Sequence, residues 1–385
     1  MVFPSLHSLK NIFRSFHGSD SYEFSLSRMR QIGVIPEIRN IYFLIDYYFL
    51  KNVLEIVIDD EDRRNRILGD ALLMMASGSF SQDHYLELRL ISFSSGFSFN
   101  KLLRKFYVDR FSSYEPVDER GVQIFNNLTS YGYHVIPPST QSIAFCKDVN
   151  LLFDQAILVR EKDGIHGTLK DLLSENVSGG FRFNAKEEEL PTLAALRLIR
   201  EAGILAAISS YLGSPILRQV ESWASVRPNG FNDQDIISAA QKFHFDLDNP
   251  AGWVKVFIYL NDVDALNGPH VYAPKSHLAL PINLRRDGRF DDDEVNKAFG
   301  STVEFHGSQG TIIVADTLGF HKGRTVETGI RKIFCLEFVA SLHGNITKKH
   351  LKPKAILAHI DEFNERLLYR YKRDAYANEI SDFLE

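Results

Sequence analysis

The sequence contains few cysteines and no long uninterrupted apolar run. Only two of its 385 residues are cysteine, Cys146 and Cys335, which is too few for a disulfide framework. Each lies in an apolar, strand-like stretch that suits a small buried side chain. The apolar stretch at residues 41–58 is interrupted by three charged side chains, Asp46, Lys51 and Glu55. We therefore expect a reducing, cytoplasmic setting and a buried amphipathic helix rather than a membrane span.

Long blocks of charge of a single sign are also absent. Lysine and arginine total 44 against 49 aspartates and glutamates, for a net charge of −5. This balance gives no electrostatic reason to expect binding to nucleic acid or to an anionic membrane. The first residues, MVFPSLHSLKNIFRSF, have no continuous apolar segment and no small-residue cleavage site, so they do not predict a secretory signal. A hydrophobic content of 44% is ample for a substantial core.

Residues 1–115 contain no metal-ligand spacing, phosphate-binding loop or internal repeat. Their apolar spacing predicts helices at residues 35–58 and 63–76, with a weaker helix at 102–111. The acidic run at residues 59–62 predicts a solvated turn before a helix. We interpret this part as a mainly helical extension with a structural role or a protein partner, although no motif identifies such a partner.

The pattern changes near residues 115–116, where a unit of helix, turn and strand begins. The segment VQIFNNLTSYGYHVIPP predicts a short helix, a turn at Gly132 and a strand that ends at Pro137-Pro138. A second helical segment follows Pro191 and ends at residues 213–215. Residues 164–180 are predicted to form an exposed loop that borders a pocket.

Beyond Pro215 the periodicity becomes that of β-strands. Six short apolar segments are separated by Gly, Pro, Asn and Asp: ILRQVESWASVRP, SAAQKFHFDLD, WVKVFIYLNDV, HVYAPKSH, GTIIVADTLGFH and KIFCLEFVAS. This arrangement predicts an antiparallel barrel of two sheets, of jelly-roll type. The charged residues 285–300 are predicted to form a loop, and residues 354–371 a helix that packs outside the barrel.

Two histidines and one aspartate have the pattern of a metal site. His244 and Asp246 are two residues apart, so in an extended strand their side chains point to one face. His321 follows at the end of another apolar segment. Two imidazoles and one carboxylate on one face of an octahedron leave positions for a chelating co-substrate and for dioxygen, as in non-haem Fe(II) oxygenases. Arg331, ten residues after His321, has a guanidinium suited to two-point binding of a carboxylate.

Three segments resemble a known family. HFDLD, VKVFIYLNDVDALNGPHVYAPKSH and GFHKGRTVETGIR are similar to the core motifs of the phytanoyl-CoA dioxygenase family, which belongs to the Fe(II)- and 2-oxoglutarate-dependent oxygenases. The resemblance covers roughly residues 121–341 and is dense only from residue 244 to 331. It implies a double-stranded β-helix, which is a jelly-roll or cupin-like barrel.

The resemblance also implies roles for individual residues. It implies that iron is bound by His244, Asp246 and His321, and that Arg331 binds the distal carboxylate of 2-oxoglutarate. Gln241 matches a position that often faces the co-substrate. The expected fold is then α+β, with a helical extension at residues 1–115, an oxygenase domain at 116–345 and a helical tail at 346–385.

Two residues depart from the family pattern. Lys275 occupies a place in the APKSH turn where many members have glycine, so the backbone of this turn is expected to differ. Gly323, two residues past the second histidine, has no hydroxyl group to help hold the co-substrate. Neither change removes a metal ligand.

The expected function is that of a 2-oxoglutarate-dependent dioxygenase, an oxidoreductase that hydroxylates a small organic substrate and releases succinate and CO2. Asp246 argues against halogenation, because related halogenases replace this carboxylate with a small residue. The motifs contain no coenzyme A site, so the family name does not identify the substrate. Two alternatives remain open: a cupin-type metal enzyme, an isomerase or hydrolase that does not use 2-oxoglutarate, and a non-catalytic barrel that serves as a binding module.

Some of these residues also have a purely structural interpretation. Arg331 has Glu327 and Glu337 as alternative ion-pair partners, and Arg324 is a competing cation. The other histidines of this region, His270 and His277, are interpreted as strand and turn residues because the metal triad is complete without them.

Overall fold

A computed structural model describes most of the chain between residues 50 and 340. The described ranges are 50–68, 82–110, 117–160, 163–175, 177–183, 191–213, 215–227, 241–247, 249 and 251–340, with short pieces at 358–359, 362–363 and 367–368. Of the predicted N-terminal helices, residues 50–57, 61–68 and 102–110 are described and are helical. The predicted helix at 354–371 lies almost wholly outside the described residues.

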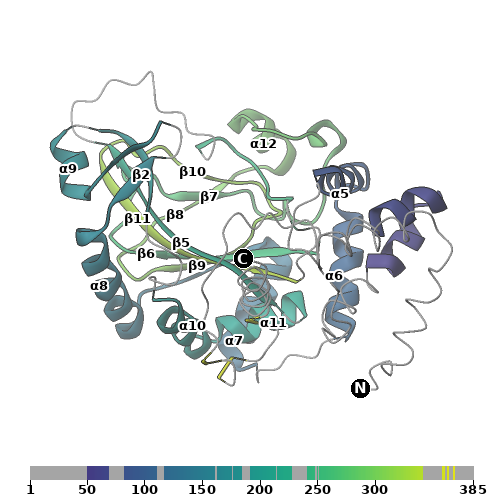
Figure 1. The fold of residues 1–385 in the computed structure, drawn as a ribbon, viewed down its shortest axis with the longest axis horizontal. Coiled ribbons are helices and arrows are strands. Elements are labelled where there is room, and N and C mark those ends of the chain that lie inside the picture. Colours follow the sequence, from purple (N-terminus) through teal and green to yellow (C-terminus); the bar gives the residue numbers. More distant parts are fainter. Residues whose placement is uncertain are drawn as a thin grey trace, which may run out of the picture.

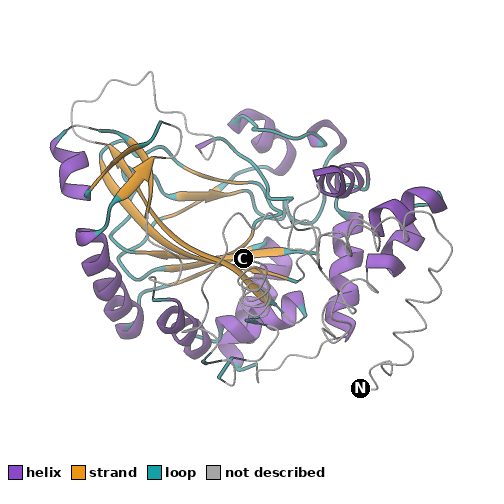
Figure 2. Cartoon of the chain, viewed as in Figure 1, coloured by secondary structure: helices purple, strands orange, loops and turns teal. Residues whose placement is uncertain are grey.

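The larger of two sheets has eight antiparallel strands in the order β1-β9-β6-β11-β5-β4-β2-β3 (Figure 2). Their bounds are Tyr133–Ile136 for β1, Ile312–Asp316 for β9, Trp253–Tyr259 for β6, Gly329–Val339 for β11, Ile216–Arg227 for β5, Gly179–Phe183 for β4, Leu158–Arg160 for β2 and Ile165–Gly167 for β3. β11 pairs with β5 on one side and with β6 on the other, so it lies in the centre of the sheet.

The smaller sheet has three antiparallel strands in the order β10-β7-β8. These are β10 (His321–Gly323), β7 (His270–Tyr272) and β8 (Val303–Phe305). The strand predicted for SAAQKFHFDLD is not formed in its described part: only single bridges occur, between Phe243 and Phe290 and between His244 and His321. The chain turns away after this bridge, since Asp246 N donates to Thr317 O and not to a neighbouring strand.

The central strands alternate between two environments. In β6, Val254, Val256 and Ile258 belong to a core shared with helices, whereas Phe257 and Tyr259 face the smaller sheet. The hydroxyl of Tyr259 donates to Phe305 O at 2.8 Å, which ties the two sheets together. Because side chains alternate along a strand, Lys255 points to the same side as Phe257, between the sheets.

Helices cover the outer faces of both sheets (Figure 1). α7 (Glu119–Tyr131), α8 (Thr140–Gln155), α10 (Thr192–Glu201) and α11 (Ile204–Leu212) pack on the larger sheet. α12 (Asp292–Phe299) packs on the smaller sheet, through Val295 and Phe299. No helix among the described residues is long and apolar enough to cross a membrane.

The predicted unit of helix, turn and strand near residue 132 is confirmed. Asp118 caps the N-terminus of α7 by accepting a hydrogen bond from Gly121 N. Gly132 ends the helix with φ of 88°, a left-handed conformation that favours glycine. β1 follows directly and ends before Pro137.

Two segments predicted as loops contain helices. Residues 164–180 include β3, α9 (Leu169–Ser174) and the start of β4, and Thr168 and Asp171 form a capping box at α9. Residues 285–300 include α12, which begins with a capping box between Asp291 and Glu294. The acidic residues that suggested a solvated loop lie in the first turn of α12, where the helix dipole favours negative charge.

The described N-terminal helices α5 (Gln82–Ser94) and α6 (Ser98–Arg110) contact later parts of the chain. Leu103 and Tyr107 of α6 belong to the same core cluster as residues of the larger sheet. Arg104 Nη2 lies 3.0 Å from Asp316 Oδ2 at the end of β9. The predicted domain boundary near residue 115 stays a prediction.

Candidate metal centre

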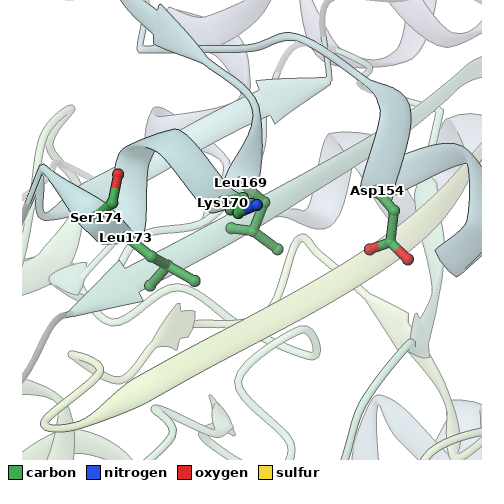
Figure 3. A pocket seen from close by; sticks show the side chains of 5 residues that line it. All are labelled: Asp154, Leu169, Lys170, Leu173 and Ser174. Atoms are coloured by element: carbon green, nitrogen blue, oxygen red, sulfur yellow. The ribbon is translucent and has the colours of Figure 1, made fainter.

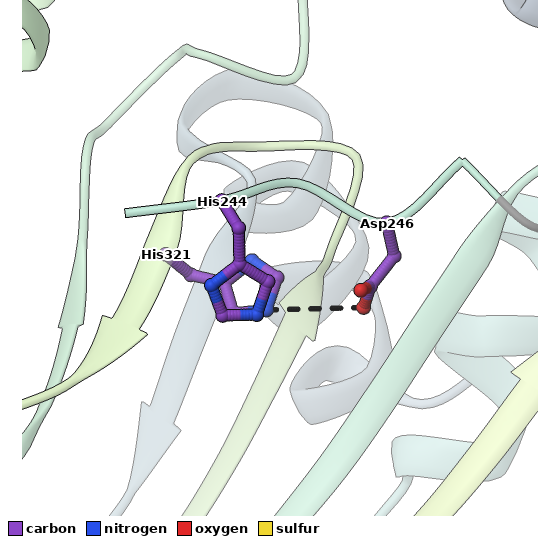
Figure 4. Close-up of side chains that lie close together, drawn as sticks. All are labelled: His244, Asp246 and His321. Atoms are coloured by element: carbon purple, nitrogen blue, oxygen red, sulfur yellow. Dashed lines mark ion pairs between the residues drawn. The ribbon is translucent and has the colours of Figure 1, made fainter. Parts of the chain in front are cut away.

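His244, Asp246 and His321 lie close together at the open edge of the smaller sheet. Each offers one ligand atom, and the three atoms lie within 4.8 Å of one another. His321 Nε2 is 3.8 Å from Asp246 Oδ2, and the centroids of the two imidazole rings are 4.3 Å apart. In Figure 4 the rings overlap in projection and the carboxylate of Asp246 points toward them. These three residues form a candidate site for one divalent metal.

Backbone hydrogen bonds bring these residues together from distant parts of the sequence. His244 N donates to His321 O at 3.0 Å, and His321 N donates back to His244 O at 2.9 Å. Asp246 N donates to Thr317 O at 2.8 Å. The His-x-Asp segment is therefore held by β10 at His244 and by the residue after β9 at Asp246.

The hydrogen bonds of the two histidines determine which ring nitrogens remain for a metal. Nδ1 of His244 lies 3.0 Å from Lys242 O, and Nδ1 of His321 lies 2.9 Å from Gly319 O. Because a carbonyl oxygen only accepts, each Nδ1 must carry the proton. Each Nε2 then keeps its lone pair, as a metal ligand requires.

The electrostatics also favour the protonation states that bind metals. Burial and the neighbouring His321 lower the pKa of His244 to about 3, and burial lowers the pKa of His321. Burial alone would raise the pKa of Asp246, but Lys255 and the two histidines hold it below its usual value. At neutral pH the site therefore consists of two neutral imidazoles and a carboxylate. Asp246 Oδ2 is buried and has no aligned hydrogen bond among the described residues, although the Lys255 ammonium lies 3.1 Å from it.

Lys255 of β6 is a functional candidate that the sequence analysis missed. Its Nζ lies 3.1 Å from Asp246 Oδ2 and 3.0 Å from Glu337 Oε1. Burial would lower the pKa of Lys255, but these two carboxylates raise it, so the ammonium stays charged. The signal that could have revealed this role is a single lysine within the otherwise apolar strand WVKVFIY.

A second cluster of acidic and thiol groups lies behind the first. Glu221, Cys335 and Glu337 bring their ligand atoms within 4.8 Å of one another. Cations already neutralise this cluster, because Arg218 and Lys255 pair with Glu337 and Arg182 pairs with Glu221. Burial raises the pKa of Cys335 well above its usual value, so the thiol is protonated. We interpret this cluster as a buried ion-pair network.

Arg331 of β11 is a buried cation between the two sheets. Its side chain donates through Nη1 to Gly268 O and through Nη2 to Ser225 Oγ at 3.3 Å, whereas Nε has no hydrogen-bond partner among the described residues. No described carboxylate forms an ion pair with it. A buried charge without a counter-ion is costly, so this environment suits an anionic ligand.

The alternative partners proposed for Arg331 are engaged elsewhere. Glu327 lies 3.2 Å from Arg324, which also pairs with Glu304 at 2.8 Å on the surface. Glu337 pairs with Lys255. Arg324 is thus a partly exposed cation, whereas the guanidinium of Arg331 is buried between the two sheets.

The two departures from the family pattern have structural explanations. Lys275 adopts φ of 68°, the left-handed conformation that glycine favours; a difference from the turn of other family members stays a prediction. A Cβ atom at Gly323 would lie 2.7 Å from Arg331 Nη2. Gly323 therefore provides the space that the guanidinium occupies.

The remaining sequence candidates stay outside the metal cluster. His277 is buried in its turn, with Nε2 3.3 Å from Thr129 O. Gln241 is half-buried three residues before His244, and its contact with a co-substrate stays a prediction.

The segment expected to border a pocket does so. A hollow of about 650 Å³ is lined by Asp154 of α8 and by Leu169, Lys170, Leu173 and Ser174 of α9 (Figure 3). None of the three metal-site residues lines it.

No protein-family model matches the chain, and no curated protein matches it, so the resemblance to the phytanoyl-CoA dioxygenase family rests on the motif residues alone. Several solved structures are similar. The 2-oxoglutarate-dependent epimerase SnoN from nogalamycin biosynthesis is 17% identical, with a TM-score of 0.40 over 57% of this chain and 80% of that one. EctD from S. alaskensis with bound Fe is 18% identical, with a TM-score of 0.38 over 60% and 79%. HygX from Streptomyces hygroscopicus, with nickel and 2-oxoglutarate bound, is 14% identical, with a TM-score of 0.38 over 58% and 87% of the two chains.

Proposed function

We propose that this protein is an Fe(II)- and 2-oxoglutarate-dependent oxygenase whose two sheets form a double-stranded β-helix. The observation that carries the proposal is the convergence of His244, Asp246 and His321 with their metal-binding atoms unprotonated. This set of two imidazoles and one carboxylate suits Fe(II) with open coordination positions.

Arg331 extends the proposal from metal binding to the co-substrate. Its buried guanidinium, without a carboxylate partner among the described residues, would bind the distal carboxylate of 2-oxoglutarate. When bound, iron and 2-oxoglutarate supply the oxidative decarboxylation that yields succinate and CO2 and activates dioxygen. Gln241 is a further candidate for contact with the co-substrate.

The other residues orient the ligands and keep water out. Lys242 O and Gly319 O fix the imidazole rings of His244 and His321 through their Nδ1 protons. Lys255 Nζ contacts Asp246 Oδ2, the carboxylate oxygen that lies 3.8 Å from His321 Nε2. His321 is buried and His244 and Asp246 are half-buried, which limits access of solvent to the reacting centre.

We propose hydroxylation of a small organic substrate as the reaction. Asp246 supplies a third protein ligand, so the coordination position that a halide would take in a halogenase is filled. The substrate would bind beside the metal and present a C–H bond to it.

The test is iron-dependent turnover of 2-oxoglutarate. Protein purified without oxygen should bind one Fe(II) per chain and convert 2-oxoglutarate to succinate when candidate substrates are supplied. His244→Ala and Asp246→Ala should abolish both. His306→Ala is the matched control, because His306 is a half-exposed histidine paired with Glu304 at 3.1 Å.

Two outcomes would replace the proposal by another function. If the chain binds Fe(II) but Arg331→Ala leaves the affinity for 2-oxoglutarate unchanged, a cupin-type isomerase or hydrolase becomes the better account. If the wild-type chain takes up no Fe(II), the fold serves as a non-catalytic binding module.

A further inference from the structure

His270 lies next to the candidate metal centre on the inner face of the smaller sheet. In the β7–β10 pair, His321 is opposite Tyr272 and Gly323 is opposite His270. Partners in an antiparallel pair share a face, so His270 is the diagonal neighbour of His321. The two ring centroids are 5.6 Å apart, with an angle of 25° between the ring planes.

The imidazole of His270 is buried among aromatic rings. Only 5% of the residue is exposed, and Nε2 has no hydrogen-bond partner among the described residues. Its neighbours include the rings of Phe257 and Phe305, with centroids at 4.7 and 5.9 Å. A buried polar group without a hydrogen bond costs free energy, so a polar ring among aromatic ones calls for a ligand.

The guanidinium of Arg331 approaches the same place from the opposite sheet. It packs over Gly323, the residue paired with His270, and donates to Gly268 O, two residues before His270. Arg331 Nε is likewise buried without a partner among the described residues. Two buried nitrogens without partners among the described residues, His270 Nε2 and Arg331 Nε, therefore belong to side chains that flank Gly323.

We propose that His270 is a second donor for the distal carboxylate of the 2-oxo acid, beside Arg331. The neutral imidazole donates one N–H to a carboxylate oxygen, and the guanidinium supplies the charge. Together the two residues make the site selective for a 2-oxo acid with a second carboxylate. This inference rests on the proposed function, since it assigns a further residue to the same co-substrate.

The residue has a chemically matched set of variants. His270→Leu removes the donor and replaces the imidazole with an apolar side chain of similar size. His270→Gln keeps an N–H donor near the position of Nε2. Phe305→Leu changes the packing against the same ring without removing a donor.

The experiment is calorimetric titration of Fe(II)-loaded protein without oxygen, with two ligands. 2-Oxoglutarate has the distal carboxylate, whereas 2-oxobutyrate has the same chelating end and lacks it. His270→Leu should weaken binding of 2-oxoglutarate by about 10- to 100-fold, the range for a hydrogen bond to a charged group. It should leave 2-oxobutyrate binding unchanged. His270→Gln should restore most of the lost affinity, and Phe305→Leu should affect both ligands alike.

Each other result overturns the inference. Equal losses for both ligands in His270→Leu would assign His270 to the metal end of the site or to packing. Unchanged 2-oxoglutarate affinity would make it a core residue. If the wild-type Fe(II) protein does not bind 2-oxoglutarate at all, the proposed function fails and this inference fails with it. Bound iron and the far-UV circular dichroism spectrum of each variant show whether the variant is folded.

Discussion

Lys255 Nζ lies 3.1 Å from Asp246 Oδ2, so a buried ammonium contacts the carboxylate of the candidate metal centre. The same ammonium is 3.0 Å from Glu337 Oε1, and Glu337 also pairs with Arg218. Three strands, β5, β6 and β11, thereby support one carboxylate, that of Asp246, whose backbone N–H donates to Thr317 O. The orientation of Asp246 depends on this chain of charges as well as on its own backbone.

Removing this ammonium should weaken metal binding. In Lys255→Met the pKa of Asp246 should rise, because the ammonium that lowers it is gone. A proton then competes with the metal at higher pH than in the wild type. We expect a loss of about 10- to 100-fold in Fe(II) affinity, as for other residues that orient a metal ligand, and a steeper decline below neutral pH. Titration with Fe(II) from pH 5.5 to 7.5 measures both effects.

Lys332 provides the matched control for Lys255. It lies on β11, is half-buried, and its Nζ contacts Asn150 on the helix-covered side of the sheet. Lys332→Met should leave Fe(II) affinity unchanged. Equal Fe(II) affinities of Lys255→Met and the wild type would contradict the role given to Lys255.

A methyl group at position 323 should displace Arg331. The Cβ of Gly323→Ala would lie 2.7 Å from Arg331 Nη2 and 3.1 Å from Nη1, so the guanidinium must move. We expect the dissociation constant for 2-oxoglutarate to rise by about 10-fold, from a weakened charge-assisted hydrogen bond. Iron content should stay the same, because the ligand atoms of His321 are not in contact with the new methyl group. Gly167→Ala is the control, since its nearest atoms lie at 3.5 Å, an ordinary contact. Unchanged binding of 2-oxoglutarate in Gly323→Ala would show that Arg331 does not need this space.

The metal-free protein should lose stability as the pH falls below about 6.5, the pKa of histidine in an unfolded chain. Burial lowers the pKa of His244 to about 3 and also lowers those of His270, His277 and His321. The unfolded chain therefore binds more protons than the folded one in this window, so the free energy of unfolding decreases with decreasing pH. Each such histidine contributes up to about 1.4 kcal/mol per pH unit. Urea unfolding in the presence of a chelator at pH 7.5, 6.0 and 5.0 measures the slope.

One histidine can be removed from this slope without a change in fold. His270→Phe replaces a ring that already packs against Phe257 and Phe305. The dependence of stability on pH should become shallower by about the contribution of one histidine. If the stability of the wild type does not depend on pH, the buried histidines take up protons in the folded state. If the pH dependence of His270→Phe equals that of the wild type, His270 takes up its proton in the folded state.

Helix α6 should contribute to the stability of the whole described core. Asp316 is fully buried and accepts from Tyr211 Oη at 2.6 Å, with Arg104 Nη2 at 3.0 Å. Arg104→Met leaves this carboxylate without its cation, so we expect a loss of about 3–5 kcal/mol in the free energy of unfolding. The double variant Arg104→Met with Asp316→Asn should lose less than the sum of the single changes. Additive losses would mean that the two residues do not act as a pair.

The sequence by itself determined the local features. Side chains alternate along a strand, so the spacing of His244 and Asp246 indicated a shared face. Gly132 predicted the end of α7 because its left-handed conformation is a property of glycine. The loops predicted over α9 and α12 were wrong because short helices with acidic caps have the composition of solvated turns.

Only the tertiary structure decided which residues surround the three candidate ligands. Lys255 comes near Asp246 because β6 and the bridged segment at 244 approach each other across the interior, and no spacing in the sequence encodes that approach. His270 comes beside Arg331 through the register of β7 against β10, in which Gly323 leaves room for the guanidinium. Register is fixed by the packing of whole strands, so a shift by one residue would turn His270 outward. The types of chemical group were therefore in the sequence, and their arrangement around one point came from the folded sheets.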